Sequence, residues 1–386
     1  MVLAAAVMLA AVNLRPALTS VAALLSLIGE RLALGPTALG VLTTLPVLCL
    51  GLAAPLAPLL TRRIGMERAV LWLLAVLALA LLARPYLGAA GFFIATALVG
   101  AAMGTTGVLL PALVKRDFPT QVGLMTGLYT VVLSLGAALG AGATEPLRIA
   151  LDGAWQFALA AWMLPVLPAL AVWLPLARGT GAAPAPATRR ASLLGDALAW
   201  QVTLFMGLQS SLAYSVFGWL PAILADRGLS AVTAGVALSA AIVISMASAL
   251  AAPWVGGRMR DQRLVNALSI VLFIAGAIGC VAGPLALLWP SIVLLGTGMG
   301  AAFAMALTLI ALRAPDTERA GQLSAMAQGF GYILAAGGPL AVGLLHDATG
   351  GWNATVGLLL AIGAAALASG IAAGRDRLVG QARVTD

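Results

Sequence analysis

Long uncharged apolar runs recur along the whole chain, and they constrain its fold more than any other feature. Each run covers about 20 residues or more, the length that an α-helix needs to cross ~30 Å of hydrocarbon. Only 9% of the 386 residues are charged, and the mean hydropathy is +1.06, whereas soluble domains contain about a quarter charged residues. No polar stretch is long enough to form a separate soluble core. The sequence therefore predicts an all-α polytopic membrane protein.

The apolar runs, bounded by turn and charge signals, predict twelve membrane-spanning helices. They cover residues 3–28, 37–60, 68–84, 88–114, 121–144, 154–177, 198–224, 231–256, 264–284, 289–312, 320–344 and 352–373. A segment rich in Gly, Pro and Ala separates the sixth span from the seventh. We therefore expect a six-helix half at 1–177, a cytoplasmic linker at 178–197 and a second six-helix half at 198–386. We expect the first span to be retained, because it lacks the basic start of a signal peptide.

Basic residues are distributed unequally between the predicted connections. If the N-terminus is cytoplasmic, the outer connections hold only four of the 21 Lys and Arg residues, namely Arg31, Arg84, Arg148 and Arg227. Because cytoplasmic connections are enriched in Lys and Arg, we expect a multi-pass protein of the cell inner membrane with both termini in the cytoplasm. We interpret Arg62, Arg63 and Arg258, in two inner connections, as topology determinants and gating contacts. The net charge of +8 then reflects membrane insertion, and we expect no nucleic acid partner.

The two predicted halves resemble each other in sequence. "LGPTALGV" (34–41) is similar to "LSAVTAGV" (229–236) at an offset of 195 residues, and "GAAMG" (100–104) is similar to "GTGMG" (296–300) at an offset of 196. Such weak similarity indicates an internal structural repeat. Repeats of this kind are typical of transporters that bind their substrate near the middle of the membrane and move one repeat against the other.

Four segments carry a resemblance to a known family. They are "NLRP" (13–16), "LTTLPVLCLGLAAPLAP" (42–58), "PLLTRRIGMER" (58–68) and "YSVFGWLPAIL" (214–224). With twelve spans in two related halves, they resemble the major facilitator superfamily, and within it the cyanate/2-nitroimidazole transporter branch, over essentially the whole chain. One departure is Arg62, which occupies a position where the superfamily has Asp. The resemblance implies the major facilitator fold, a central cavity lined by spans 1, 4, 7 and 10, and a small or flat substrate.

Arg15 is the one charged residue that the predicted spans place deep in the membrane. A charge there costs about 3 kcal/mol on insertion scales unless it faces water or a partner. Pro16 removes the helical hydrogen bond to the carbonyl of Val12, which bends the helix at this point. We expect Arg15 to bind an electron-rich ligand with its planar fork of donors. The alternative is that Arg15 caps the carbonyls that Pro16 leaves free and touches no substrate.

Other polar and aromatic side chains at mid-depth are candidates for substrate binding. In an ideal helix Asn13 and Arg15 point about 200° apart, so either the proline bend brings them together or one alone reaches the cavity. The amides and hydroxyls offer hydrogen bonds, and the aromatic rings offer stacking. For each of them, an ordinary interhelical contact is the alternative. The predicted substrate-binding residues are Asn13, Arg15, Thr43, Thr106, Tyr129, Gln209, Tyr214, Trp219, Gln328 and Tyr332.

The sequence predicts a secondary active or facilitated transporter that moves a small anionic or flat polar molecule, such as cyanate or a nitroimidazole, by alternating access. Multidrug or antimicrobial efflux of neutral compounds is the first alternative, and a receptor or scaffold without transport is the second. A membrane-embedded enzyme is disfavoured, because the single histidine, His346, and the separated cysteines, Cys49 and Cys280, offer no catalytic or metal-binding cluster. We expect no cofactor and no metal, a lipid bilayer and a small molecule as partners, and a monomer.

Overall fold

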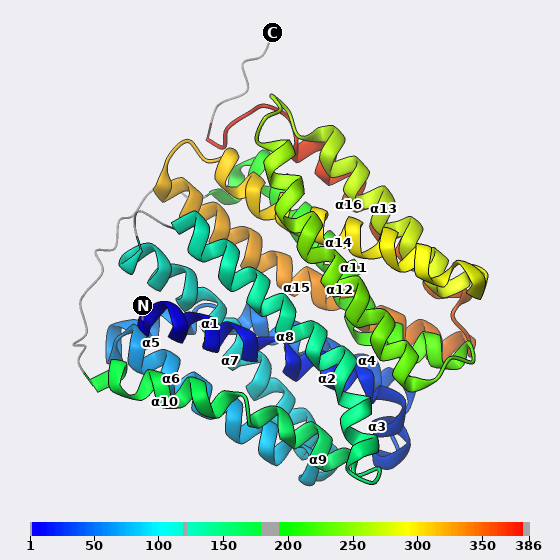
Figure 1. Ribbon diagram of the computed structural model, residues 1–386. Coiled ribbons are helices and arrows are strands. Elements are labelled where there is room, and N and C mark those ends of the chain that lie inside the picture. Colours follow the sequence, from blue (N-terminus) through cyan, green and yellow to red (C-terminus); the bar gives the residue numbers. More distant parts are fainter. Residues whose placement is uncertain (1, 119–121, 179–192, 381–386) are drawn as a thin grey trace. The chain divides into compact units, whose positions relative to one another are not determined.

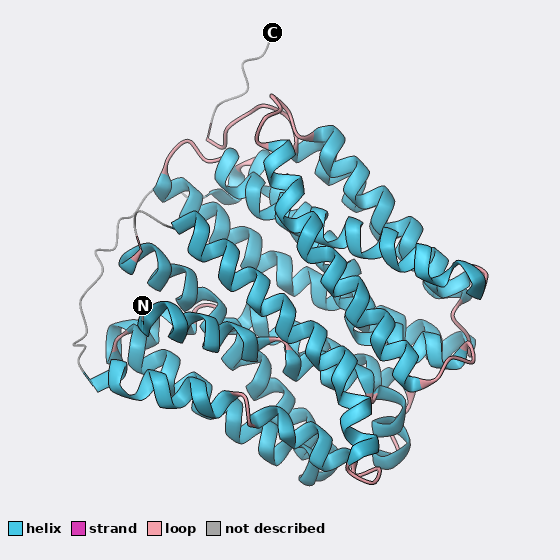
Figure 2. Cartoon of the chain, in the orientation of Figure 1, coloured by secondary structure: helices cyan, strands magenta, loops and turns pink. Residues whose placement is uncertain are grey.

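The computed structural model describes residues 2–118, 122–178 and 193–380, and within these ranges the chain forms helices without any strand (Figures 1 and 2). The longer helices are α1 (Val2–Leu14), α2 (Pro16–Ala23), α3 (Leu25–Leu32), α4 (Pro36–Ala53), α5 (Leu56–Ile64), α6 (Met66–Ala83), α7 (Gly88–Asp117), α8 (Val122–Ala150), α9 (Trp155–Ala160), α10 (Val166–Arg178), α11 (Ala197–Asp226), α12 (Ala231–Gly256), α13 (Arg263–Ala282), α14 (Leu288–Leu312), α15 (Thr317–Thr349) and α16 (Asn353–Ala373). Short 3-10 helices are η1 (Arg84–Tyr86), η2 (Ala161–Met163), η3 (Leu193–Gly195) and η4 (Leu285–Leu287).

These helices contain twelve segments that are long and apolar enough to cross a membrane. The prediction of an all-α protein with twelve spans is confirmed, and most predicted spans agree with the observed segments to within a few residues. The fifth span, predicted at 121–144, belongs to α8, which continues to Ala150. The structure adds breaks inside the first, second and sixth spans, where a single span is built from consecutive shorter helices.

The chain divides into two compact units. Unit 1 comprises Met1–Ala187 and Phe217–Ile242, and unit 2 comprises Thr188–Val216 and Val243–Asp386. Helices α11 and α12 therefore contribute to both units. The predicted halves, 1–177 and 198–386, stay a prediction, and the greater part of the predicted linker, 179–192, lies outside the described residues.

The first span is broken twice, and the first break follows from the sequence. Helix α1 ends at Leu14 and α2 begins at Pro16, whose ring cannot donate a backbone hydrogen bond. A second break separates α2 from α3 at Leu24, which has a φ of −115° and a ψ of 17°. The eight-residue helix α2 is thus continuous with neither neighbour, and its place depends on side-to-side packing.

Helix α8 provides much of that packing through its glycines. A Cβ atom on Gly136 would overlap the carbonyl oxygen of Val12, the same carbonyl that Pro16 deprives of its helical donor. One turn later, a Cβ on Gly140 would lie 2.8 Å from the Cα atom of Pro16. The hydroxyl of Thr19 donates a hydrogen bond of 2.9 Å to the carbonyl of Ala137. Small residues let helix backbones approach closely in membranes, and here they fit α8 against the first break.

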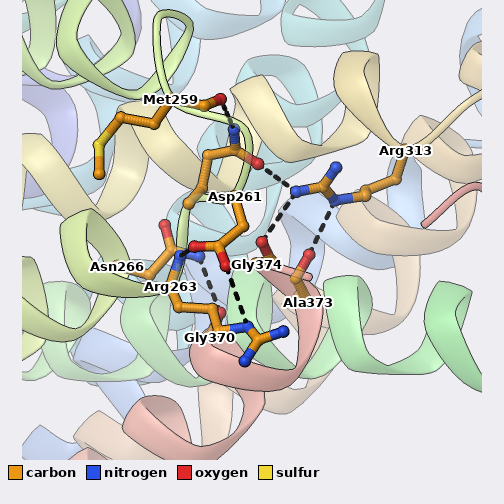
Figure 3. A network of polar contacts seen from close by, with 9 residues as sticks. Met259, Asp261, Arg263, Asn266, Arg313, Gly370, Ala373 and Gly374 are labelled. Atoms are coloured by element: carbon orange, nitrogen blue, oxygen red, sulfur yellow. Dashed lines mark hydrogen bonds and ion pairs between the residues drawn. The ribbon is translucent and has the colours of Figure 1, made fainter. Parts of the chain in front are cut away.

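Unit 2 contains an arginine that is fully engaged by the protein. Arg313 follows α14 and is only 2% exposed. Its Nε atom donates to the carbonyl of Ala373 at 2.9 Å, and its Nη2 atom donates to the carbonyl of Gly374 at 3.0 Å and to Oε1 of Gln262 (Figure 3). Burial lowers the pKa of Arg313, whereas the charges of Asp376 and Asp261 act in the opposite direction. The arginine ties the ends of α14 and α16 to the connection before α13.

We expect Gly136→Ala to destabilise the protein, because the added methyl group overlaps the Val12 carbonyl. Overpacking of this kind typically costs about 1–3 kcal/mol, which should appear as a lower melting temperature of the purified protein in detergent. Gly107→Ala is the matched control, since a Cβ at this helical position meets nothing within 4 Å. Equal melting temperatures for the two variants would contradict the close approach.

Candidate functional site

Arg15 lies at the break between α1 and α2, as the residue before the first turn of α2. Its backbone is close to helical, with a φ of −97° and a ψ of −25°. Its carbonyl accepts hydrogen bonds from the amides of Leu18 at 3.0 Å and Thr19 at 3.2 Å. Arg15 is therefore anchored by the first turn of α2, and the half-buried side chain moves with that short helix.

An aromatic residue from another helix of unit 1 lies near the Arg15 side chain. The Cζ atom of Arg15 lies 5.9 Å from the ring centre of Phe217, which belongs to α11. Because Phe217 belongs to a packed helix of the unit, this side of the Arg15 side chain faces protein. A guanidinium above an aromatic face keeps its in-plane N–H donors directed away from the ring, which suits a flat or anionic ligand.

Asn13 occupies a different environment from Arg15. Its buried side-chain nitrogen donates hydrogen bonds to the carbonyls of Leu9 at 2.7 Å and Pro165 at 3.0 Å. The second of these bonds joins α1 to the chain between η2 and α10. The structure does not bring the Asn13 amide to Phe217 and Tyr129, and its role in substrate binding stays a prediction.

The remaining predicted residues of unit 1 are buried. The hydroxyl of Thr43 in α4 donates to the carbonyl of Gly40 at 3.0 Å. Thr43 also packs against α11, where a Cβ on Gly218 would lie 3.0 Å from the Thr43 Cβ atom. Trp219 follows in α11 and is buried, as is Thr106 in α7. The contact between Thr43 and Gly218 places this part of α4 beside the turn of α11 that carries Phe217.

The predicted residues of unit 2 form an aromatic pair and a buried amide. The rings of Tyr214 in α11 and Tyr332 in α15 meet edge to face, with their centres 6.2 Å apart. The Nε2 atom of Gln209 donates to the carbonyl of Met206 and to the hydroxyl of Ser210, while its Oε1 atom is buried without a hydrogen-bond partner. Gln328 donates to the hydroxyl of Ser324 at 2.8 Å. The structure thus brings Tyr214 and Tyr332 together.

The three predicted gating and topology residues are all exposed. Arg62 and Arg63 form the last turn of α5. Arg258 follows α12, where its Cζ atom lies 3.8 Å from the ring centre of Trp254 and its Nη1 atom donates to the Trp254 carbonyl at 2.9 Å. These positions at helix ends fit residues that contact water or lipid headgroups, and their role in gating stays a prediction.

Sequence reasoning missed three charged side chains that the structure buries in unit 1. Arg84, expected in an outer connection, is fully buried, and so are Glu67 and Glu145. Glu145 accepts a bidentate hydrogen bond from Arg148 in the next turn of α8, with both distances 2.7 Å. These three residues lie near the ends of their spans, so the expectation that Arg15 is the one charged residue deep in a span stays a prediction. The spacing of "EPLR" (145–148) indicated the ion pair of Glu145 and Arg148, because residues three apart on a helix are neighbours.

A cavity of about 260 Å³ lies beside this ion pair, at the break between α2 and α3. Its walls include alanines from α2, α11 and α12, and its charged lining residues are Glu30, Glu145 and Arg148. The cavity is separate from the Phe217 ring and the Tyr129 hydroxyl. Charged side chains therefore lie near both breaks of the first span, Arg15 at the first break and the lining residues of this cavity at the second.

Comparison with known families decides the class of protein. A model of the Major Facilitator Superfamily matches residues 2–339. The chain belongs to the major facilitator superfamily. A crystal structure of a D-xylose-proton symporter shares the fold, with a TM-score of 0.75 at 14% identity, covering 98% of each chain. The predicted fold class is thereby confirmed.

Two curated relatives of the chain come from Escherichia coli (strain K12). The 2-nitroimidazole transporter is 39% identical over 97% of this chain and 96% of the relative. The cyanate transport protein CynX is 30% identical over 88% of each chain. The resemblance to the cyanate/2-nitroimidazole branch is confirmed. The chain is a multi-pass membrane transporter and not an enzyme, and the described residues contain no group of His, Cys, Asp and Glu that could hold a metal ion.

We expect a cysteine at position 15 to react with a water-soluble thiol reagent, because the Arg15 side chain is only half-buried and its charge favours a position that water can reach. Arg15→Cys in a Cys49→Ser, Cys280→Ser background should be labelled at least about tenfold faster than Ala10→Cys in the same background. Ala10 belongs to the same span and is fully buried. Equal, slow labelling at both positions would show that position 15 has no path to water.

Proposed function

We propose that this transporter moves a small anionic or flat polar molecule, of the class to which cyanate and 2-nitroimidazole belong, by alternating access. The names of two full-length relatives support this substrate class. We further propose that the protein works as a monomer in the inner membrane, with both termini in the cytoplasm, as either a secondary active or a facilitated transporter. The proposed substrate class rests on the position of Arg15, at the break between α1 and α2.

The electrostatics of Arg15 favour an electron-rich ligand. A guanidinium remains charged at any physiological pH, and a charge at the centre of a span costs about 2.5–3.5 kcal/mol on insertion scales. Two unit charges 4 Å apart interact by about 4 kcal/mol at an effective dielectric constant of about 20. This energy attracts an anion and repels a cation of the same size. Multidrug efflux of cationic compounds is therefore disfavoured at this site.

The geometry around Arg15 favours a small or flat ligand. The Arg15 Cζ atom lies over the Phe217 ring at 5.9 Å. We expect a ligand to meet the edge of the guanidinium plane, where parallel N–H donors can bind two acceptor atoms. Cyanate and the nitro group of 2-nitroimidazole both present electron-rich atoms in a line or a plane. We expect the hydroxyl of Tyr129 in α8 to donate to the same ligand.

Arg15→Ala should lower transport of cyanate and 2-nitroimidazole into proteoliposomes by at least about tenfold, since a charge-assisted hydrogen bond contributes about 1.5–3 kcal/mol. Arg15→Lys should give an intermediate rate, because an ammonium keeps the charge and loses the planar fork. Arg31→Ala is the control, since Arg31 lies in the exposed last turn of α3. Normal transport by both Arg15 variants would reduce Arg15 to an architectural role and overturn the proposal.

Ligand-dependent thermal stability separates the proposal from efflux of neutral or cationic drugs. A ligand present at 100 times its Kd stabilises the folded protein by about 2.7 kcal/mol. Cyanate and 2-nitroimidazole should raise the melting temperature of the wild type and leave that of Arg15→Ala unchanged. Tetraphenylphosphonium, a lipophilic cation, should have no effect on the wild type. Stabilisation by the cation alone would support the efflux alternative instead.

A further inference from the structure

Arg84 is a second arginine inside unit 1, and the transport mechanism has so far not used it. It is the first residue of η1 and directly follows the last residue of α6. Its relative exposure is 0%, which is lower than that of Arg313. A charge that is removed from water costs several kcal/mol unless it is well paired, so the burial of Arg84 calls for a physical explanation.

The guanidinium of Arg84 is hydrogen-bonded at one edge only. Nη1 donates to the carbonyl of Ala17 in α2 at 3.0 Å. The Cζ atom lies 5.3 Å from the ring centre of Phe92 in α7, and that ring in turn lies 6.5 Å from the ring of Trp155. Nε and Nη2 are buried without a hydrogen-bond partner. One bond to α2 is thus the polar contact that Arg84 makes.

Arg313 illustrates how an arginine that serves as a structural tie is satisfied. Its Nε and Nη2 atoms bind Ala373, Gly374 and Gln262, so the edge that Arg84 leaves without partners is occupied in Arg313 (Figure 3). Buried donors without partners destabilise a fold by about 1–3 kcal/mol each. The buried Arg84 guanidinium therefore contributes little to the free energy of unfolding. An apolar side chain of similar length would fill the same space without a buried charge or unpaired donors.

The one partner of Arg84 belongs to the segment that carries Arg15. Helix α2 is interrupted at both ends, from α1 at Arg15 and from α3 at Leu24, so contacts from the side contribute to where it lies. On one side α8 holds it, through the hydrogen bond from Thr19 to Ala137. Arg84, at the junction of α6 and η1, adds a hydrogen bond to the carbonyl of Ala17. Ala17 lies two residues after Arg15 in the sequence.

We propose that Arg84 is a positioning residue for substrate recognition. Its buried guanidinium holds α2, through the Ala17 carbonyl, in the place that sets Arg15 over Phe217. This inference rests on the proposed function of Arg15. It predicts an unusual combination: loss of the Arg84 guanidinium weakens substrate binding while the thermal stability of the protein is unchanged or higher.

A double-mutant cycle tests the coupling between the two arginines. Initial uptake of cyanate, below its KM, is measured in proteoliposomes for wild type, Arg84→Met, Arg15→Ala and the double variant. We expect Arg84→Met to lower uptake about fivefold or more when Arg15 is present, through a higher KM with a smaller change in kcat. In the Arg15→Ala background the same substitution should change uptake less than about twofold. Arg31→Met, on the exposed last turn of α3, is the control and should match the wild type.

The outcomes of the cycle separate the proposed function of Arg15 from the positioning role of Arg84. Equal losses in both backgrounds, or a loss that follows a lower melting temperature, would overturn the positioning role and leave the function of Arg15 intact. Normal uptake by Arg15→Ala would overturn the proposed function and the inference that depends on it. If Arg84→Met does not yield folded protein, Arg84→Lys replaces it, because an ammonium retains one donor for Ala17. The Lys variant should then raise KM only where Arg15 is present, and an equal effect in both backgrounds would refute the positioning role.

Discussion

The interruption of the first span at Pro16 is the constraint on which the candidate site depends. A continuous helix would satisfy the Val12 carbonyl internally and would carry Arg15 as one more side chain on its surface. Proline removes the donor, and the chain restarts as the short helix α2 with Arg15 before its first turn. Glycines of α8 accommodate the distorted backbone at close range. The functional side chain and the packing that supports it therefore have one common cause.

Hydropathy and the missing amide donor of proline are the sequence features that predicted the structure correctly. Twelve spans and the break at Pro16 are consequences of local rules, since a helix must cover the hydrocarbon and a proline cannot donate. Contacts between distant residues were beyond such rules. The amide of Asn13 binds the carbonyl of Pro165 across 152 residues of sequence, and nothing in either segment marks the pair. The sequence placed Arg84 in a connection because it ends an apolar run. In the structure Arg84 is the first residue of η1, and its side chain is buried inside unit 1.

The predicted repeat pairs positions whose side chains make different contacts. At the offset of 196 residues, Ala177 at the end of α10 corresponds to Ala373 at the end of α16. Each carbonyl accepts a hydrogen bond from an arginine, but the donors are not equivalent. Arg68, at the start of α6, binds Ala177 at 3.0 Å, whereas Arg313, after α14, binds Ala373 at 2.9 Å. At the offset of 195 residues, Arg68 corresponds to Arg263, which instead forms an ion pair with Asp261 at 3.5 Å.

The same comparison explains why anion recognition is assigned to one half of the repeat. Asn13 corresponds to Gln209 at the offset of 196, and each amide donates to a carbonyl of its own preceding turn. Arg15 corresponds to Ser211, and Pro16 to Leu212, so α11 continues unbroken from Ala197 to Asp226. A serine in an intact helix can return its hydroxyl to the backbone and carries no charge. Only the half that contains the broken helix combines a fixed positive charge with a backbone segment whose place depends on its neighbours.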